Sequence, residues 1–119
     1  LSGLVEQPQL KFTKGNFLLH PTTMIRMDFL KKNALKYENC PYAEDFKFWV
    51  EIAKSGGRFY IDSQPLLYYR ISDSQVSSQK SSEQRATTES IINEVLEYLI
   101  ELNKNEYPAL VAAYGDLCK

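Results

Sequence analysis

The sequence predicts a mixed α/β fold in which two helices flank a pair of short strands. Residues 43–55 and 82–103 both carry apolar side chains at helical spacing. Between them, residues 58–62 and 66–70 are short runs rich in aromatic and aliphatic side chains, separated by a Gln-Pro turn. Strands that alternate with helices in this way are typical of α/β and α+β domains.

Segment 43–55 is the clearest helix. Its apolar stripe follows positions i, i+3, i+4 and i+7 and consists of Phe46, Trp49, Val50 and Ala53. Gly56 and Gly57 end the helix, because glycine adopts the left-handed conformation of a C-cap without steric cost. Glu44 and Asp45 fall in the first turn. We therefore expect the stripe to be buried and the two carboxylates to be exposed.

The N-terminal part carries weaker signals. Residues 1–14 predict a loop or mobile arm, because they hold scattered polar side chains together with a glycine and a proline. Residues 16–26 predict one strand, or two short strands broken at Pro21, which cannot donate to a central ladder. Residues 28–33 predict one or two turns of helix, with an aspartate at the positive end.

The C-terminal part is expected to be helical after a loop. Serine-rich residues 72–82 predict the loop, and residues 82–103 predict the longest helix of the chain. Pro108 interrupts the pattern, and residues 109–114 predict a short last helix.

Composition limits the class of protein. The 119 residues are 44% hydrophobic and 24% charged, which suits one domain or part of one. The formal net charge of −1 gives no electrostatic footprint for nucleic acid. No apolar run approaches the roughly 20 residues of a membrane span. Cys40 and Cys118 are isolated, so we expect free thiols and a cytoplasmic location, with peripheral attachment to the inner face of a membrane as an alternative.

Three sets of side chains are candidates for chemistry, and two of them have an ordinary structural alternative. The carboxylates of Glu44 and Asp45 either complement the helix dipole or present a general base to a cleft. Arg70 either pairs with a surface carboxylate or binds a phosphate oxygen. The single histidine, His20, argues against a zinc site, and the glycines form no phosphate-binding loop.

Four motifs follow one another along residues 15–80. They are HPTTMIR at 20–26, AEDFKFW at 43–49, GGRFYI at 56–61 and PLLYYR at 65–70. In this order and spacing they resemble the C-terminal half of family 2 glycosyltransferases, which are inverting enzymes of the GT-A fold. The resemblance implies the C-terminal part of a GT-A-type mixed sheet with flanking helices. Residues 1–80 would be the acceptor-side half of the catalytic domain, and residues 81–119 a C-terminal helical extension.

The resemblance also implies roles for individual residues. The catalytic base of the family falls on Asp45, which would take the proton of an acceptor hydroxyl as it attacks the anomeric carbon. Glu44 would contact the acceptor, and Arg70 the donor diphosphate, while His20 and Thr22 would line the cleft. The implied partners are a nucleotide-sugar donor and a glycan or lipid-linked acceptor, as in polysaccharide biosynthesis.

The nucleotide-binding half of such an enzyme is not in this chain. No two aspartates lie at i and i+2, so the Asp-x-Asp motif that would hold a divalent metal, Mn²⁺ or Mg²⁺, is missing. We expect the full-length protein to use that metal, and this chain alone to be inactive. Many relatives also carry a histidine at the position of Ser72.

Two alternatives to an enzyme remain open. The chain could be a non-catalytic module that binds a saccharide or a protein, in which Trp49, Tyr68 and Tyr69 would stack on sugar rings. The apolar stripe of helix 82–103 could also serve chiefly to form an oligomer.

Overall fold

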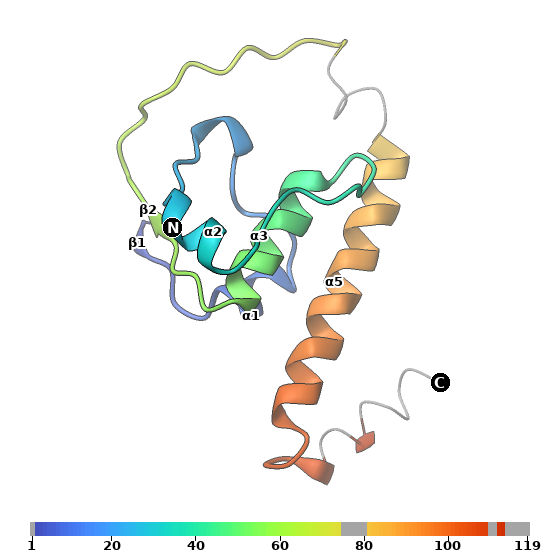
Figure 1. The fold of residues 1–119 in the computed structure, drawn as a ribbon. Helices are drawn as coiled ribbons and strands as arrows, with labels where there is room; N and C mark the ends of the chain where they lie inside the picture. The colour runs from blue at the N-terminus through green and yellow to red at the C-terminus, as the bar shows by residue number, and fades with distance from the viewer. Residues whose placement is uncertain (1, 75–80, 110–111, 114–119) are drawn as a thin grey trace.

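The structure, a computed structural model, describes residues 2–74, 81–109 and 112–113. Its elements are β1 (Gly3–Leu4), α1 (Pro8–Phe12), the 3₁₀ turn η1 (His20–Thr22), α2 (Met27–Lys32), α3 (Glu44–Lys54), β2 (Tyr60–Ile61) and α5 (Ser81–Asn103). α3 and α5 lie side by side, and α1 packs against both (Figure 1). We call α1, α3 and α5 the helical body.

The helix expected over 43–55 is confirmed as α3, and all four residues of its apolar stripe are buried. Gly56 has φ +85°, and the N–H of Gly57 donates to the carbonyl of Ile52 at 2.9 Å, which is the pattern of a Schellman C-cap. At the other end no side chain caps the free amides. Glu44 is exposed as expected, whereas Asp45 is half-buried.

The core lies where the three helices of the body meet. Phe12 of α1 and Trp49 of α3 are 0% and 1% exposed, and Ile91 and Val95 of α5 are buried with them. The expectation of a loop over 1–14 is therefore wrong. That segment forms β1 and α1, because α3 and α5 supply the apolar cover that Phe12 needs.

The sheet consists of two short antiparallel strands. β1 pairs with β2 so that Gly3 lies opposite Ile61 and Leu4 opposite Tyr60. The N–H of Val5 extends the pairing by donating to the carbonyl of Phe59 at 2.8 Å. The strand expected over 58–62 is thus confirmed only at its centre.

Two other expected strands are wrong. Residues 16–26 form irregular chain and η1, and residues 66–70 belong to no ladder. A strand needs a neighbour for its N–H and C=O groups, and the described residues provide only the β1–β2 pair. In these residues we find a mostly helical chain with one small antiparallel sheet in place of the expected mixed sheet.

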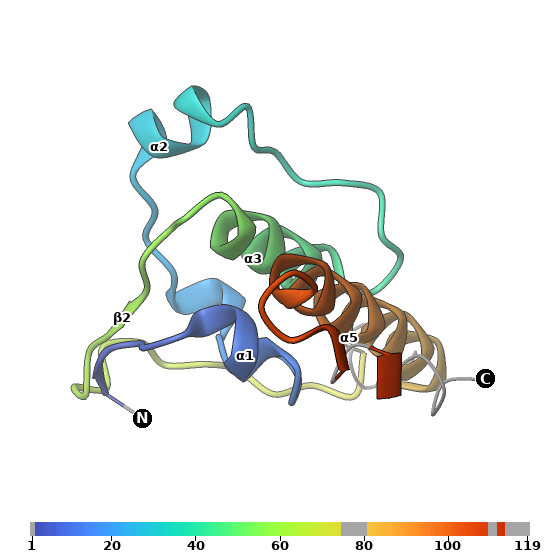
Figure 2. The same cartoon turned by 90° about the horizontal axis from the view of Figure 1, so that it is seen from below.

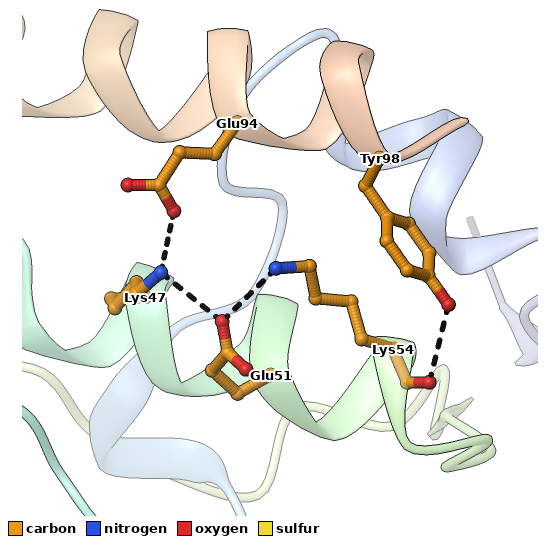
Figure 3. Close-up of polar contacts among 5 residues, drawn as sticks. All are labelled: Lys47, Glu51, Lys54, Glu94 and Tyr98. Carbon is orange, nitrogen blue, oxygen red and sulfur yellow. Dashed lines mark hydrogen bonds and ion pairs between the residues drawn. The ribbon is translucent and has the colours of Figure 1, made fainter. Parts of the chain in front are cut away.

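The longest predicted helix is confirmed as α5, whose apolar stripe packs on the rest of the body. Polar contacts add to this packing (Figure 3). Nζ of Lys47 lies 2.5 Å from Oε2 of Glu94 on α5 and 3.1 Å from Oε1 of Glu51 on α3. Nζ of Lys54 lies 3.3 Å from the same oxygen of Glu51. The pair between Lys47 and Glu94 joins α5 to α3, and the two pairs of Glu51 lie within α3.

Among the parts of the chain outside the helical body are α2 and the stretch after β2. α2, which confirms the short helix expected over 28–33, stands away from α1 and α5 (Figure 2). Residues 62–74 run around the periphery (Figure 1). Most of the loop expected at 72–82 and much of the helix expected at 109–114 fall outside the described residues. Within the described ranges, no helix combines the length and the apolar character needed to cross a bilayer.

Candidate functional site

Asp45, the predicted base, is held from one side. Nδ2 of Asn16 donates to Oδ2 of Asp45 at 3.3 Å. Oδ1 of Asn16 accepts from the N–H of Leu18 at 3.0 Å, and this second bond fixes the orientation of the amide. The other carboxylate oxygen of Asp45 accepts no hydrogen bond from the described residues. One oxygen is therefore engaged and the other is open to a ligand.

The start of α3 is positioned by tertiary contacts. Tyr42 has φ +65°, a left-handed conformation that costs a residue with a side chain about 1–3 kcal/mol. Its carbonyl accepts a hydrogen bond from Nε2 of Gln84 on α5 at 2.9 Å. The next N–H, that of Ala43, donates to the carbonyl of Cys40 at 3.1 Å. Asp45 thus owes its place to α5 and to the turn before α3.

His20 lies beside the same face of α3. Nε2 of His20 and the hydroxyl of Tyr37 share a hydrogen bond of 2.9 Å, and the imidazole meets the Trp49 ring edge-on with 5.8 Å between centroids. The Tyr37 ring packs on Phe48 at a centroid distance of 4.1 Å. We call His20, Tyr37, Phe48 and Trp49 the aromatic cluster. It adjoins Asp45, because Trp49 follows Asp45 by one helical turn.

The phenol of Tyr37 has a shifted pKa. Burial raises the pKa of Tyr37, and the negative charge of Asp45 raises it further. Tyr37 keeps its proton at neutral pH and can donate it in a hydrogen bond. His20 meets Trp49, which lies one helical turn after Asp45, so His20 and Asp45, predicted separately, lie at the same end of α3.

The indole of Trp49 is part of the core. It is 1% exposed, so it cannot offer a ring face to a sugar, and the alternative in which it stacks on a saccharide is wrong. Its N–H is the one buried side-chain polar group without a hydrogen-bond partner among the described residues. An unpaired buried donor of this kind costs about 1–3 kcal/mol. Tyr68 and Tyr69, by contrast, are exposed.

A hollow of about 800 Å³ opens next to the aromatic cluster. Its lining is mostly apolar, with two lysines among the side chains. The lining consists of His20, Thr23, Ile25, Met27, Leu30, Lys31, Ala34, Leu35, Lys36, Tyr37 and Phe48. Asp45 is not part of it, so the hollow adjoins the carboxylate without enclosing it.

The other predicted site residues are less closely gathered. Glu44 is exposed next to Asp45. Thr22 is exposed in η1, two residues after His20, and its hydroxyl donates to a backbone carbonyl of the same turn at 2.7 Å. Arg70 is exposed on the peripheral stretch that follows β2 (Figure 1). The structure therefore places His20 at the same end of α3 as Asp45 and Arg70 on a separate segment.

Two residues of the site were not predicted from the sequence, namely Asn16 and Tyr37. Both lie in irregular segments, where no periodicity shows which way a side chain points. Asn16 does carry one signal, because asparagine often accepts a hydrogen bond from the backbone two residues on. Tyr37 carries none that we recognise.

The described residues do not fit a divalent metal. No three His, Cys, Asp or Glu side chains among them come close enough together to hold one. We therefore derive no step through a metal from this chain.

Comparison with known proteins gives one informative likeness. No model of a protein family matches the chain, and no solved structure matches it. Over 86 residues, 69% of its length, the chain is 34% identical to an uncharacterized glycosyltransferase of Haemophilus influenzae. The matched part is 26% of that protein, so the chain spans about a quarter of the relative's length. The chain is thus similar to part of a glycosyltransferase.

Proposed function

We propose that this chain is the acceptor-side part of an inverting, nucleotide-sugar-dependent glycosyltransferase of the family 2 type. The observation that carries the proposal is the state of Asp45. Its carboxylate projects from the first turn of a packed helix, with one oxygen held by Asn16 and the other open. The similarity to a glycosyltransferase supports the class of reaction.

In the proposed reaction an acceptor hydroxyl lies against the open oxygen of Asp45. The carboxylate takes the hydroxyl proton while the acceptor oxygen forms a bond to the anomeric carbon of the donor. The bond from that carbon to the diphosphate oxygen breaks, and the nucleoside diphosphate leaves with the electron pair. Attack from the face opposite the leaving group inverts the configuration. A positioned base of this kind contributes about 10²–10⁴-fold to the rate.

The neighbouring side chains take supporting roles in this proposal. The Tyr37 hydroxyl, which remains protonated, can donate to a saccharide oxygen beside Asp45. Glu44 contacts the acceptor, and His20 and Thr22 line the approach to it. Arg70 contacts the donor diphosphate. The donor half, including any metal site, belongs to the rest of the full-length protein, which we expect in the cytoplasm, and this chain alone is inactive.

A non-catalytic saccharide-binding module is the second candidate. Its support is the exposure of Tyr68 and Tyr69, which leaves aromatic faces free for sugar rings. This candidate requires no catalytic base. The two candidates therefore predict different effects when Asp45 is substituted.

The test is a transfer assay with the full-length protein. Uridine and guanosine diphosphate sugars are supplied with Mn²⁺ or Mg²⁺ and a panel of glycan and lipid-linked acceptors. The anomeric configuration of any product is determined by NMR. We expect transfer with inversion by the native protein and transfer about 10²–10⁴-fold slower by Asp45→Asn. Saccharide binding without turnover of any donor, or product with retained configuration, would overturn the proposal.

A further inference from the structure

The stretch from Leu19 to Tyr37, which we call the arm, leaves large apolar side chains in solvent. The arm comprises η1, α2 and the turn that leads to Tyr37. Met24 is 98% and Leu19 68% exposed, and Ile25 and Met27 are exposed as well. A hydrophobic patch of this kind marks a surface that contacts another molecule.

The same arm is cationic. Arg26, Lys31, Lys32 and Lys36 are all exposed, and the only carboxylate in the arm is that of Asp28. In the described part of the chain none of these four cations forms an ion pair with a carboxylate. Their charge is therefore available to an anionic partner.

Apolar and cationic groups meet in the hollow described above. Ile25, Met27 and Leu30 contribute apolar walls, Phe48 lies behind them, and Lys31 and Lys36 stand in the same lining. α2, which carries two of the wall residues, projects away from α1 and α5 (Figure 2). An apolar surface edged with cations on a projecting element can reach a planar surface without obstruction from the helical body.

We propose that the arm docks on a bilayer that contains anionic phospholipid. Binding at an interface grows with the apolar area buried at the level of the headgroups and with attraction between basic side chains and acidic lipids. The arm offers both in one place. The phosphates of a nucleic acid would pair with the lysines, but the apolar side chains of Met24 and Leu19 would stay exposed to water. The proposal does not depend on the glycosyltransferase activity.

The test measures the sedimentation of the full-length protein with lipid vesicles. Vesicles of phosphatidylcholine alone are compared with vesicles that contain about one-third phosphatidylglycerol, since the anionic lipid supplies the surface potential. We expect binding to the anionic vesicles, and weaker binding at high salt because the attraction is screened. Lys31→Ala and Lys32→Ala should each lower the partition coefficient about fivefold.

Matched controls separate the arm from the rest of the surface. Met24→Ser should weaken binding, whereas Leu66→Ser, at an exposed apolar residue outside the arm, should not. Lys14→Ala serves as the corresponding control for charge, because Lys14 is exposed outside the arm. Circular dichroism checks that each variant remains folded. The proposal is overturned if the native protein ignores both kinds of vesicle, as it would if another part of the polypeptide covered the arm. It also fails if the controls weaken binding as much as the arm variants do.

Discussion

The helical body buries most of its large apolar side chains, whereas the arm leaves Leu19, Met24, Ile25 and Met27 exposed and packs only Phe29, Leu30 and Leu35 against the core. Trp49 and Met24 mark the extremes, at 1% and 98% exposure. The body has three helices that cover one another, whereas α2 has six residues and stands apart from α1 and α5. A helix of six residues gains little from its own hydrogen bonds and cannot bury a full stripe. The comparison teaches that stability in this molecule resides mainly in the body, and that the exposed apolar side chains of the arm can contact other molecules.

The candidate site lies at the boundary between these two regions. Asp45 belongs to the body, while His20 and Tyr37 come from the arm and Asn16 from the stretch that leads to it. A group on a packed helix is held more precisely than a group on a loop. We therefore expect substitutions in the body to change stability and substitutions at the boundary to change activity.

The largest effect on stability should come from the core. Trp49→Ala should cost about 3–5 kcal/mol, because it opens a cavity that the surrounding helices cannot fill. Tyr68→Ala, at a fully exposed aromatic residue, should stay within about 0.5 kcal/mol of the native protein. Urea unfolding of the two variants measures the difference. Equal effects would mean that the body is not the stable part.

The C-cap of α3 gives the next largest effect. A Cβ on Gly57 would lie 2.4 Å from Cγ2 and 2.8 Å from the carbonyl oxygen of Ile52. Gly57→Ala should therefore destabilise the protein by about 1–3 kcal/mol, the usual cost of overpacking. Ser55→Ala, at an exposed neighbour, is the control and should change the free energy of unfolding little. Thermal unfolding followed by circular dichroism is sufficient for this comparison.

At the boundary, Asn16 should matter for rate. If Asn16 orients the carboxylate, Asn16→Ala should lower the kcat of the full-length protein about fivefold, the equivalent of one hydrogen bond of about 1 kcal/mol, and leave KM unchanged. In the Asp45→Asn background the same change should have no further effect on kcat, because the base that Asn16 orients is no longer there. Asn93→Ala, at an exposed residue of α5, is the control. Additive losses in the double variant would contradict the positioning role.

The smallest effect should come from the ion pairs that Glu51 forms with Lys47 and Lys54 within α3. Burial alone would raise the pKa of Glu51. The hydrogen bond with Lys47 and the positive charge of Lys54 outweigh burial, so the pKa of Glu51 is lowered. The carboxylate therefore stabilises the fold above its ordinary pKa of 4.5, and this contribution is lost as the pH falls through the lowered value. Glu51→Gln should cost about 0.2–1 kcal/mol at pH 7, as partly exposed pairs do.

The pH dependence distinguishes the ion pair from a packing effect. The deficit of Glu51→Gln should shrink in acid, since the native carboxylate is then protonated as well. Glu97→Gln, at an exposed carboxylate of α5, should show no such change. A deficit that stays constant between neutral and acidic pH would show that Glu51 contributes only through packing.

The sequence predicted the helical body better than its surroundings. The stripe that contains Trp49 and the glycines after it specify α3 locally, because a helix satisfies its own hydrogen bonds. The run at 66–70 has strand-like composition, but a strand depends on a neighbour that local sequence does not supply. Phe12 was overlooked for a related reason, since α1 has five residues and is held by contacts with α3 and α5. Oligomer formation through α5 stays a prediction. Ile91 and Val95 of its apolar stripe are already buried in the core of the body.

For the site, the sequence predicted which residues could react, but it did not predict what surrounds them. Asp45 and His20 were singled out by motif, and the structure places His20 against Tyr37 and against Trp49, which lies one helical turn after Asp45. Asn16 and Tyr37 reach the site through tertiary contacts of irregular segments, which leave no periodic trace in the sequence. Arg70 was placed at the end of a strand that does not form in the described residues. Its proposed contact with the diphosphate stays a prediction.

The central claim is that Asp45 is a base and does more than complement the dipole of α3. The most direct test compares kcat and melting temperature for Asp45→Asn and Glu44→Gln in the full-length protein. We expect Asp45→Asn to lower kcat by about 10²–10⁴-fold with a nearly unchanged melting temperature, because the amide keeps the shape but accepts no proton. Glu44→Gln should act mainly on the KM of the acceptor. If Asp45→Asn keeps more than about a tenth of the native kcat and both variants lose only a little stability, Asp45 is not the base.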